Sequence, residues 1–240
     1  MTTTTAPAVR PLDTDRPTLV RTARTTGLLY LGVALTGGLG FLLVRGRLFV
    51  EGDPTATLAN LVANEGLARL GVILELGLVL TQVLCALWFY RLFRSVDPFA
   101  AGAIAVFGTV NAVAILVSSA MLATALDVAG GALQSPASAA STAHLLYVVS
   151  GQLWSVAGLF FGLWLIPMGW LARRSGWMPA ALGWVLMIGG VGYVVSTFLT
   201  YAVPSTNGFA NVLTIPATIG ELWMVGYLLV IGIRRTPAAA

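Results

Sequence analysis

Six long segments of the chain contain almost no charged side chains, and this pattern constrains the fold more than any other feature. The hydrocarbon core of a bilayer is about 30 Å thick, and about 20 apolar residues of helix cross it. The chain has 240 residues, of which 58% are hydrophobic and 9% charged, whereas a soluble domain carries about 25% charged residues. These proportions predict an all-α, polytopic integral membrane bundle. We place its spans at residues 26–44, 67–91, 98–125, 142–171, 179–201 and 209–233.

The remaining parts of the chain predict a tail and one short extra helix. Residues 1–23 are rich in threonine, proline and arginine, so we expect a disordered tail ahead of a six-helix transmembrane domain at 24–235. Between the first two spans, Asp53 is suited to cap a helix and Pro54 to open it. We therefore expect a short interfacial helix that continues to Asn64.

The arginines predict the orientation of the bundle. All thirteen basic residues are arginine, and with six spans ten of them fall on one side of the membrane and three on the other. The three are Arg45, Arg47 and Arg69. Because basic residues are enriched on the cytoplasmic side, we expect both termini in the cytoplasm and the chain in the inner (cytoplasmic) membrane.

Several chemistries are excluded by the residue counts. The absence of lysine rules out Schiff-base catalysis. A single histidine and a single cysteine are too few for a zinc ribbon, an iron–sulfur cluster or a disulfide framework. We predict no cofactor, and no nucleic-acid partner despite the net charge of +4, because the arginines lie at helix ends.

Small residues recur at the spacing that helix packing uses. Gly158 and Gly162 share one face of the fourth span, and Gly189, Gly190 and Gly192 cluster in the fifth. Such residues let helix backbones approach closely. They fit packing within the bundle or a dimer interface, and the oligomeric state stays open.

Two acidic residues lie inside spans. Glu75 is in the second and Glu221 in the sixth, whereas the other seven acidic residues lie in the tail, in loops or at helix ends. An ionisable group in the hydrocarbon region costs about 2.5 kcal/mol or more and usually has a function. The alternative is a neutral glutamic acid that hydrogen-bonds a neighbouring helix. A carboxylic acid that stays neutral at about pH 7 can act as a general acid, so we predict catalytic roles for both.

Other polar side chains of the spans share helical faces with these acids or lie at similar depths. At about 1.5 Å per residue, they reach from the outer end to mid-membrane, while the cytoplasmic halves are almost entirely apolar. We therefore predict an outward-facing polar cavity with both carboxyl groups at its floor. Its predicted substrate-binding residues are Gln82, Asn111, His144, Tyr147, Gln152, Tyr193, Thr197 and Thr218.

The order and spacing of several motifs resemble a bacterial membrane family catalogued as domain of unknown function four-three-eight-six. The resemblance covers about residues 24–233. It implies a helical bundle and no established activity. The residues that carry it are Gly27-Leu28-Leu29-Tyr30, Arg69-Leu70-Gly71, Arg174-Ser175-Gly176-Trp177-Met178-Pro179, Leu182-Gly183, Gly190-Val191-Gly192-Tyr193 and Gly220-Glu221-Leu222.

Three functions fit these features. The first is an intramembrane acid–base enzyme that acts on a hydrophobic small molecule, isoprenoid-like or a membrane lipid, by analogy with the design of membrane-bound terpene cyclases. The second is a proton-coupled transporter or permease. The third is a non-catalytic membrane partner or sensor. A metal ion held by Glu75, Glu221 and His144 is a further alternative.

Overall fold

The computed structural model describes residues 15–134, 138–203 and 207–234, and every regular element in these ranges is helical. Six helices are long and apolar enough to cross a membrane, which confirms the predicted all-α, multi-span architecture. The spans are Arg16–Leu48, Glu65–Phe93, Pro98–Ala129, Ala139–Arg174, Ala180–Ala202 and Gly208–Val230.

The first span begins earlier than predicted. Helix α1 (Arg16–Gly38) continues into a π-helical segment, η1 (Leu39–Arg45), and then into the single turn α2 (Gly46–Leu48). The expectation of disorder up to residue 23 is therefore wrong for residues 16–23, while residues 1–14 lie outside the described ranges. Proline in the first turn of α1 fits this start, because the N–H that it lacks has no helical partner there.

A short helix, α3 (Pro54–Ala63), follows the first span at the predicted place. Asp53 caps it, and its side-chain Oδ1 accepts a hydrogen bond of 2.9 Å from the backbone N–H of Ala56. The position of α3 at the membrane interface stays a prediction.

The last span differs most from its prediction. Instead of one helix over 209–233, it consists of a short helix and a longer one that are separated at Leu213 and Thr214. Pro216 lies in the first turn of the longer helix, where proline is tolerated. The elements after α3 are α4 (Glu65–Phe93), α5 (Pro98–Ala129), α6 (Ala139–Arg174), α7 (Ala180–Ala202), α8 (Asn207–Val212) and α9 (Ile215–Val230).

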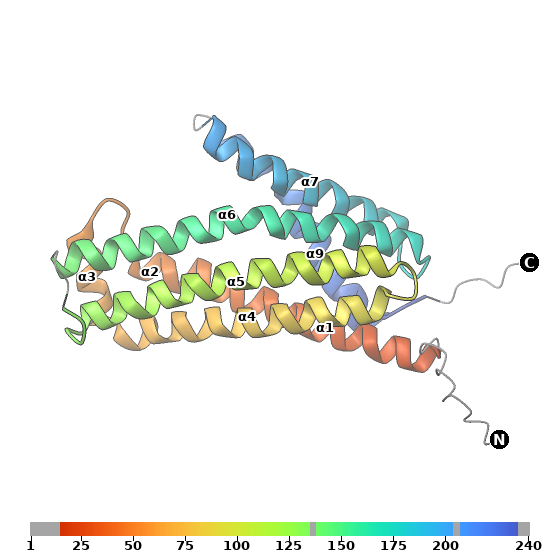
Figure 1. Cartoon of the computed structure of the whole chain (residues 1–240), viewed down its shortest axis with the longest axis horizontal. Coiled ribbons are helices and arrows are strands. Elements are labelled where there is room, and N and C mark those ends of the chain that lie inside the picture. Colours follow the sequence, from red (N-terminus) through yellow and green to blue (C-terminus); the bar gives the residue numbers. More distant parts are fainter. Residues whose placement is uncertain (1–14, 135–137, 204–206, 235–240) are drawn as a thin grey trace, which may run out of the picture.

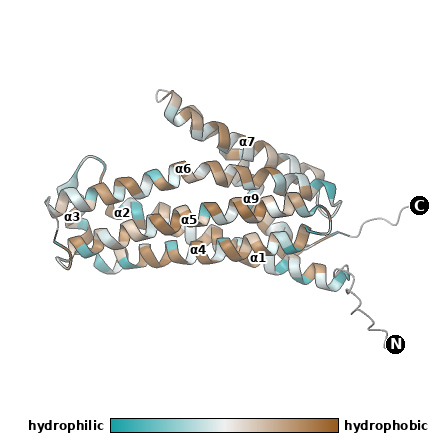
Figure 2. Cartoon of the chain, in the orientation of Figure 1, coloured by the Kyte–Doolittle hydropathy of each residue, from teal (hydrophilic) through white to brown (hydrophobic). Residues whose placement is uncertain are grey.

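The long helices form a closed ring. Each packs against two neighbours, in the order α1, α4, α5, α6, α7, α9 and back to α1 (Figure 1). Hydrophobic residues dominate the middle of the bundle and hydrophilic ones gather at its ends (Figure 2). The interior of the ring is thus reached by side chains from all six long helices.

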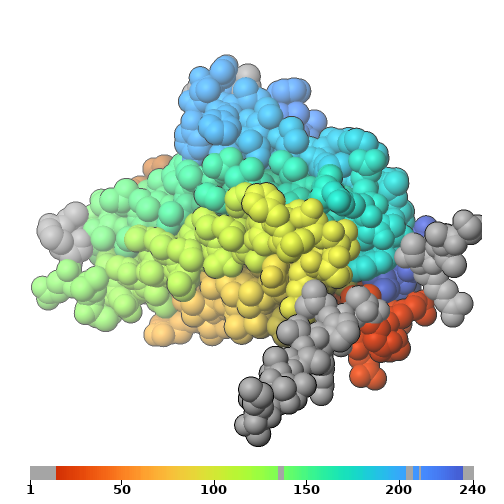
Figure 3. All heavy atoms as spheres, turned by 45° about the vertical axis from the view of Figure 1, so that its right-hand side comes forward, coloured from red at the N-terminus to blue at the C-terminus, as the bar shows by residue number. Residues whose placement is uncertain are grey.

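Glycines bring α6 and α7 together. A Cβ atom on Gly162 would lie 2.6 Å from the carbonyl oxygen of Gly190, and one on Gly190 would lie 2.7 Å from that of Gly162. Only hydrogen fits at these positions, so these small residues serve packing within the bundle. Towards its C-terminal end α7 diverges from α6 and protrudes from the molecule (Figures 1 and 3).

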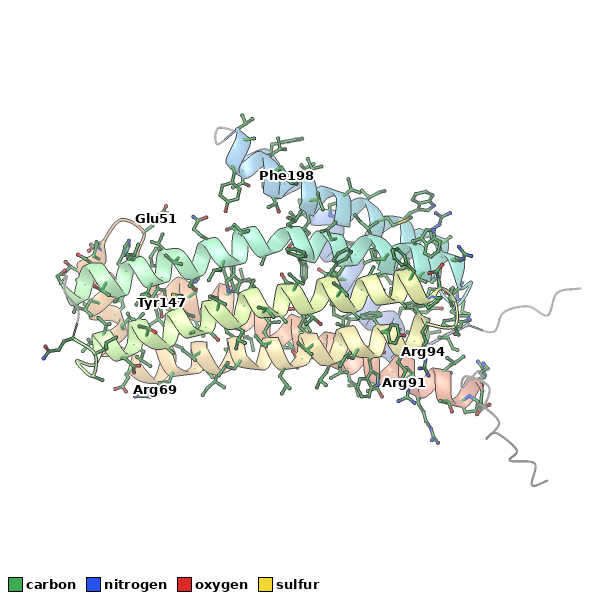
Figure 4. The ribbon with its side chains drawn as sticks, in the orientation of Figure 1. Glu51, Arg69, Arg91, Arg94, Tyr147 and Phe198 are labelled. Carbon is green, nitrogen blue, oxygen red and sulfur yellow. The ribbon has the colours of Figure 1, made fainter. Side chains whose placement is uncertain are left out.

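The two ends of the bundle carry different residues (Figure 4). Arg91 and Arg94 lie at the end where α1 starts and α9 finishes, which we call the termini end. Glu51 and Arg69 lie at the opposite end beside α3, which we call the α3 end. This arrangement fits the charge asymmetry of the sequence, while the cytoplasmic placement of the termini stays a prediction.

Candidate functional site

A cavity of about 470 Å³ lies inside the ring, and all six long helices contribute to its wall. Its volume falls in the range of about 300–1,000 Å³ that is typical of small-molecule sites. Most of the wall is apolar. The side chains in the wall that carry a hydrogen-bonding group are Tyr30, Gln82, Asn111, Trp154, Tyr193, Thr218 and Glu221.

Glu221 is the only acidic side chain that the described part of the chain contributes to the cavity wall, and it pairs with Tyr30. The hydroxyl of Tyr30 donates a hydrogen bond to Oε1 of Glu221. The tyrosine ring is held edge-on by Phe89 and Trp164, each with its ring centroid 5.5 Å away. Because Tyr30 is fixed by this packing, one carboxyl oxygen of Glu221 has a defined partner, and the other makes no hydrogen bond to a described residue.

The wall formed by α4 and α5 carries two carboxamides. Gln82 is 1% exposed, and its Nε2 has no hydrogen-bond partner within the described residues. Asn111 is also buried and lines the cavity beside it. Gln82 is thus a buried donor without an acceptor among the described residues. Leaving such a donor unpaired costs about 1–3 kcal/mol.

The cavity opens to the side of the bundle. The exposed residues of its wall come from α1, η1 and α9, and they include Leu42 at 72% and Leu222 at 61%. On the α3 side, the ring of Phe41 packs over Trp154 with a centroid separation of 4.8 Å. These exposed wall residues lie at the side of the bundle, and the outward-facing placement of the cavity stays a prediction.

Glu75 lies in a different environment from Glu221. It is 4% exposed, and its Oε1 accepts hydrogen bonds from Trp154 Nε1 at 2.9 Å and from Ser118 Oγ at 3.2 Å. Glu75 itself is not in the cavity wall, whereas Trp154 is. The prediction that both carboxyl groups form the cavity floor is thus wrong for Glu75, because the indole that lines the cavity is the group that binds it.

A chain of hydrogen bonds connects Glu75 with Arg45. Ser118 Oγ lies 2.8 Å from Ser150 Oγ, which accepts a hydrogen bond of 2.9 Å from Arg45 Nη1. Arg45 Nη2 also donates to the backbone oxygen of Tyr147. We call these five residues, Arg45, Ser150, Ser118, Glu75 and Trp154, the Glu75 network. It gives Oε1 of Glu75 and the guanidinium group of Arg45 polar partners inside the apolar bundle, while Oε2 of Glu75 has no partner among the described residues.

Three aromatic rings surround the guanidinium of Arg45. The centroids of Phe41, Phe49 and Tyr147 each lie 5.6 Å from its Cζ. Such rings attract a cation through their electron-rich faces. Arg45, which the sequence placed in an outer loop, therefore forms part of a packed polar cluster towards the α3 end.

Four of the predicted substrate-binding residues line the cavity: Gln82, Asn111, Tyr193 and Thr218. The other four have partners elsewhere. His144 lies 3.2 Å from Thr57 Oγ1 and stacks on Phe49; Tyr147 packs against Arg45; Gln152 accepts a hydrogen bond from Tyr201; Thr197 donates to the backbone oxygen of Tyr193.

The alternative metal site is not formed by its proposed ligands. Glu75, Glu221 and His144 do not come together, and the described ranges contain no cluster of three histidine, cysteine, aspartate or glutamate side chains that could hold a metal ion. His144 instead connects α3 to α6 near the α3 end.

Three residues that define the site were not predicted from the sequence. Tyr30 pairs with Glu221, Trp154 lines the cavity and binds Glu75, and Arg45 ends the Glu75 network. Tyr30 appeared only in the family resemblance, and Trp154 was hidden among apolar residues. Arg45 carried the clearest signal, because it is a charge at the end of a long apolar run.

A ring of six membrane-type helices around a side-opening cavity defines the class of this molecule: a multi-span helical membrane protein with a cavity of ligand size. The chain belongs to the family described as Domain of unknown function (DUF4386), whose sequence model matches residues 25–232. The resemblance noted in the sequence is therefore confirmed. Neither a curated protein nor a solved structure matches the chain.

Proposed function

We propose that the chain is an intramembrane enzyme that acts on a hydrophobic, isoprenoid-like or lipid substrate, with Glu221 as general acid. The observation that carries this proposal is the Glu221–Tyr30 pair in the wall of a cavity that opens sideways. A molecule dissolved in the bilayer can reach such a cavity without crossing water. Glu75 then acts through Trp154 as a positioning residue.

The chemistry follows from the pair and from the rings around it. A neutral Glu221 transfers its proton to an alkene carbon or an epoxide oxygen of the substrate, and the Tyr30 hydroxyl stabilises the resulting carboxylate. The faces of aromatic rings stabilise positive charge that develops on the substrate. The aromatic residues of the cavity wall are Tyr30, Trp154, Phe161 and Tyr193. Membrane-bound terpene cyclases offer an analogy of design for this mechanism.

The test compares Glu221→Gln with Glu75→Gln in membranes supplied with an isoprenoid epoxide. Loss of a general acid typically costs about 10²–10⁴ in rate, so we expect Glu221→Gln to reduce turnover at least about 100-fold. Glu75→Gln retains an oxygen for Trp154, and we expect its turnover to stay within about tenfold of the wild type. Unchanged turnover in Glu221→Gln would eliminate the proposed mechanism.

One observation favours a proton-coupled transporter as a second candidate. The last span is interrupted at Leu213 and Thr214, close in sequence to Thr218 and Glu221 in the cavity wall. Interrupted helices near a binding site are typical of secondary transporters. Proteoliposomes with an imposed pH gradient separate the two functions, since a transporter accumulates the isoprenoid unchanged whereas an enzyme converts it without a gradient.

A further inference from the structure

The cavity is poor in positive charge. Among the described residues, Glu221 is the one acidic residue of its wall, and none of the wall residues is an arginine or a histidine. The guanidinium of Arg45 is instead bound to Ser150 and to the backbone of Tyr147. A phosphate or carboxylate group in this cavity would face Glu221 without a cation to pair with, and unpaired buried charge is strongly unfavourable. The cavity therefore disfavours anionic ligands.

The cavity also contains a donor that lacks an acceptor. Gln82 lines the cavity, and only 1% of its surface is exposed. Its Nε2 has no hydrogen-bond partner in the described part of the chain. Buried polar groups are nearly always hydrogen-bonded. Asn111 adds a second carboxamide to the same wall. Together these side chains suit an oxygen atom that accepts hydrogen bonds.

The remaining wall suits an apolar body. Val33, Leu78, Ile115 and Val225 belong to the same wall, and the exposed Leu222 borders the side opening. Burying apolar ligand surface here contributes about 25 cal/mol per Å². A ligand that fits must therefore combine one accepting oxygen with an apolar chain.

We propose that the cavity binds an uncharged, lipid-soluble molecule whose hydrogen-bond-accepting oxygen is held by Gln82, and whose apolar chain enters between α1–η1 and α9. This proposal narrows the substrate class of the proposed function. It rests on the proposed function only in placing the ligand in the same cavity. It concerns binding, which can be measured without turnover.

The test measures binding of three probes to the purified full-length protein in detergent by native mass spectrometry. Farnesol supplies an uncharged oxygen, farnesene has the same kind of chain without oxygen, and farnesyl phosphate adds negative charge. We expect farnesol to bind at least about tenfold more tightly than either of the others, because only farnesol satisfies Gln82 without adding charge. Equal or tighter binding of farnesyl phosphate overturns the inference.

Gln82→Leu isolates the contribution of the amide. We expect it to weaken farnesol binding about tenfold and to leave farnesene binding unchanged. Gln152→Leu is the matched control, since Gln152 is exposed, pairs with Tyr201 and does not line the cavity. Equal farnesol binding by Gln82→Leu and wild type overturns the role of Gln82, and farnesene binding shows that the variant still folds around its cavity.

The entry route has its own pair of variants. Ala34 is exposed and lines the cavity, whereas its neighbour Leu35 is 53% exposed and does not. We expect Ala34→Trp to reduce farnesol binding at least about tenfold by filling the opening, and Leu35→Trp to leave it unchanged. Equal effects of the two substitutions overturn the side entry.

The inference and the proposed function fail in different ways. If farnesol binds as expected while Glu221→Gln leaves turnover of the isoprenoid epoxide unchanged, the ligand class stands and the acid mechanism falls. If the phosphate binds best while Glu221→Gln loses turnover, the mechanism stands and the ligand class falls.

Discussion

Glu75 and Glu221 are the same residue type, each inside a membrane-type helix, yet the structure surrounds them differently. Glu75 is buried behind Trp154 and accepts two hydrogen bonds, and two serines connect it to Arg45. Glu221 lies in the cavity wall with Tyr30 as its hydrogen-bond partner. The two glutamates differ in the number of their hydrogen-bond partners and in whether they line the cavity. Glu75 therefore suits a stabilising role and Glu221 a reactive one.

Removing each carboxyl group in turn gives the largest expected contrast in stability. Glu75→Ala leaves the Trp154 indole and the Ser118 hydroxyl without their acceptor, so we expect a loss of about 3 kcal/mol in the free energy of unfolding. Glu221→Ala leaves only Tyr30 unpaired, beside an existing cavity, and we expect a loss of about 1 kcal/mol. Thermal unfolding of both variants in one detergent, without ligand, measures the difference.

Glu75→Gln serves as the control for that contrast. It retains an oxygen at the position that Trp154 and Ser118 bind, so we expect it to recover most of the loss, to within about 1 kcal/mol of wild type. Equal destabilisation by Glu75→Ala and Glu221→Ala would contradict the division of roles between the two acids.

The sequence predicted the fold far better than the site, and the physical reason is the nature of the two signals. A span is defined by the average hydropathy of about 20 residues, so small local errors cancel and all six spans were found. Helix starts and interruptions depend on single residues. The start of the first helix at Arg16 was therefore missed.

For the site, the sequence predicted which polar side chains lie inside the spans but not which of them line the cavity. Glu75 and Gln82 share one face of α4 and lie seven residues, or about 10 Å, apart, yet of the two only Gln82 lines the cavity. The difference depends on which aromatic side chain fills the space beside each of them. The indole of Trp154, which separates Glu75 from the cavity wall, follows from tertiary packing and has no periodic signature.

Tyr30→Phe tests the cavity side of the comparison, with a smaller effect. The substitution removes the hydroxyl that donates to Glu221 and keeps the ring between Phe89 and Trp164. We expect turnover of the isoprenoid epoxide to fall about tenfold, which corresponds to about 1.4 kcal/mol of transition-state stabilisation. The free energy of unfolding should change by no more than about 1 kcal/mol.

Tyr147→Phe is the matched control for that variant. Tyr147 is also buried, but it contributes its backbone oxygen and its ring face to Arg45 rather than its hydroxyl, and it lies outside the cavity wall. Its turnover should match the wild type. A similar loss in both variants would indicate a general effect of removing a buried phenol instead of a role for the Tyr30–Glu221 pair.

The smallest expected effect lies in the middle of the Glu75 network, where Ser118 and Ser150 share a hydrogen bond of 2.8 Å. Ser118→Ala and Ser150→Ala should each cost about 1 kcal/mol in the free energy of unfolding. Because both remove the same bond, the double variant should cost less than their sum, with a coupling of about 0.5–1 kcal/mol. Ser155→Ala, at an exposed position on the same helix as Ser150, should stay within about 0.5 kcal/mol of wild type. Strictly additive costs for Ser118 and Ser150 would mean that the contacts between Arg45 and Glu75 are independent of one another. The connection to Arg45 would then no longer distinguish Glu75 from Glu221.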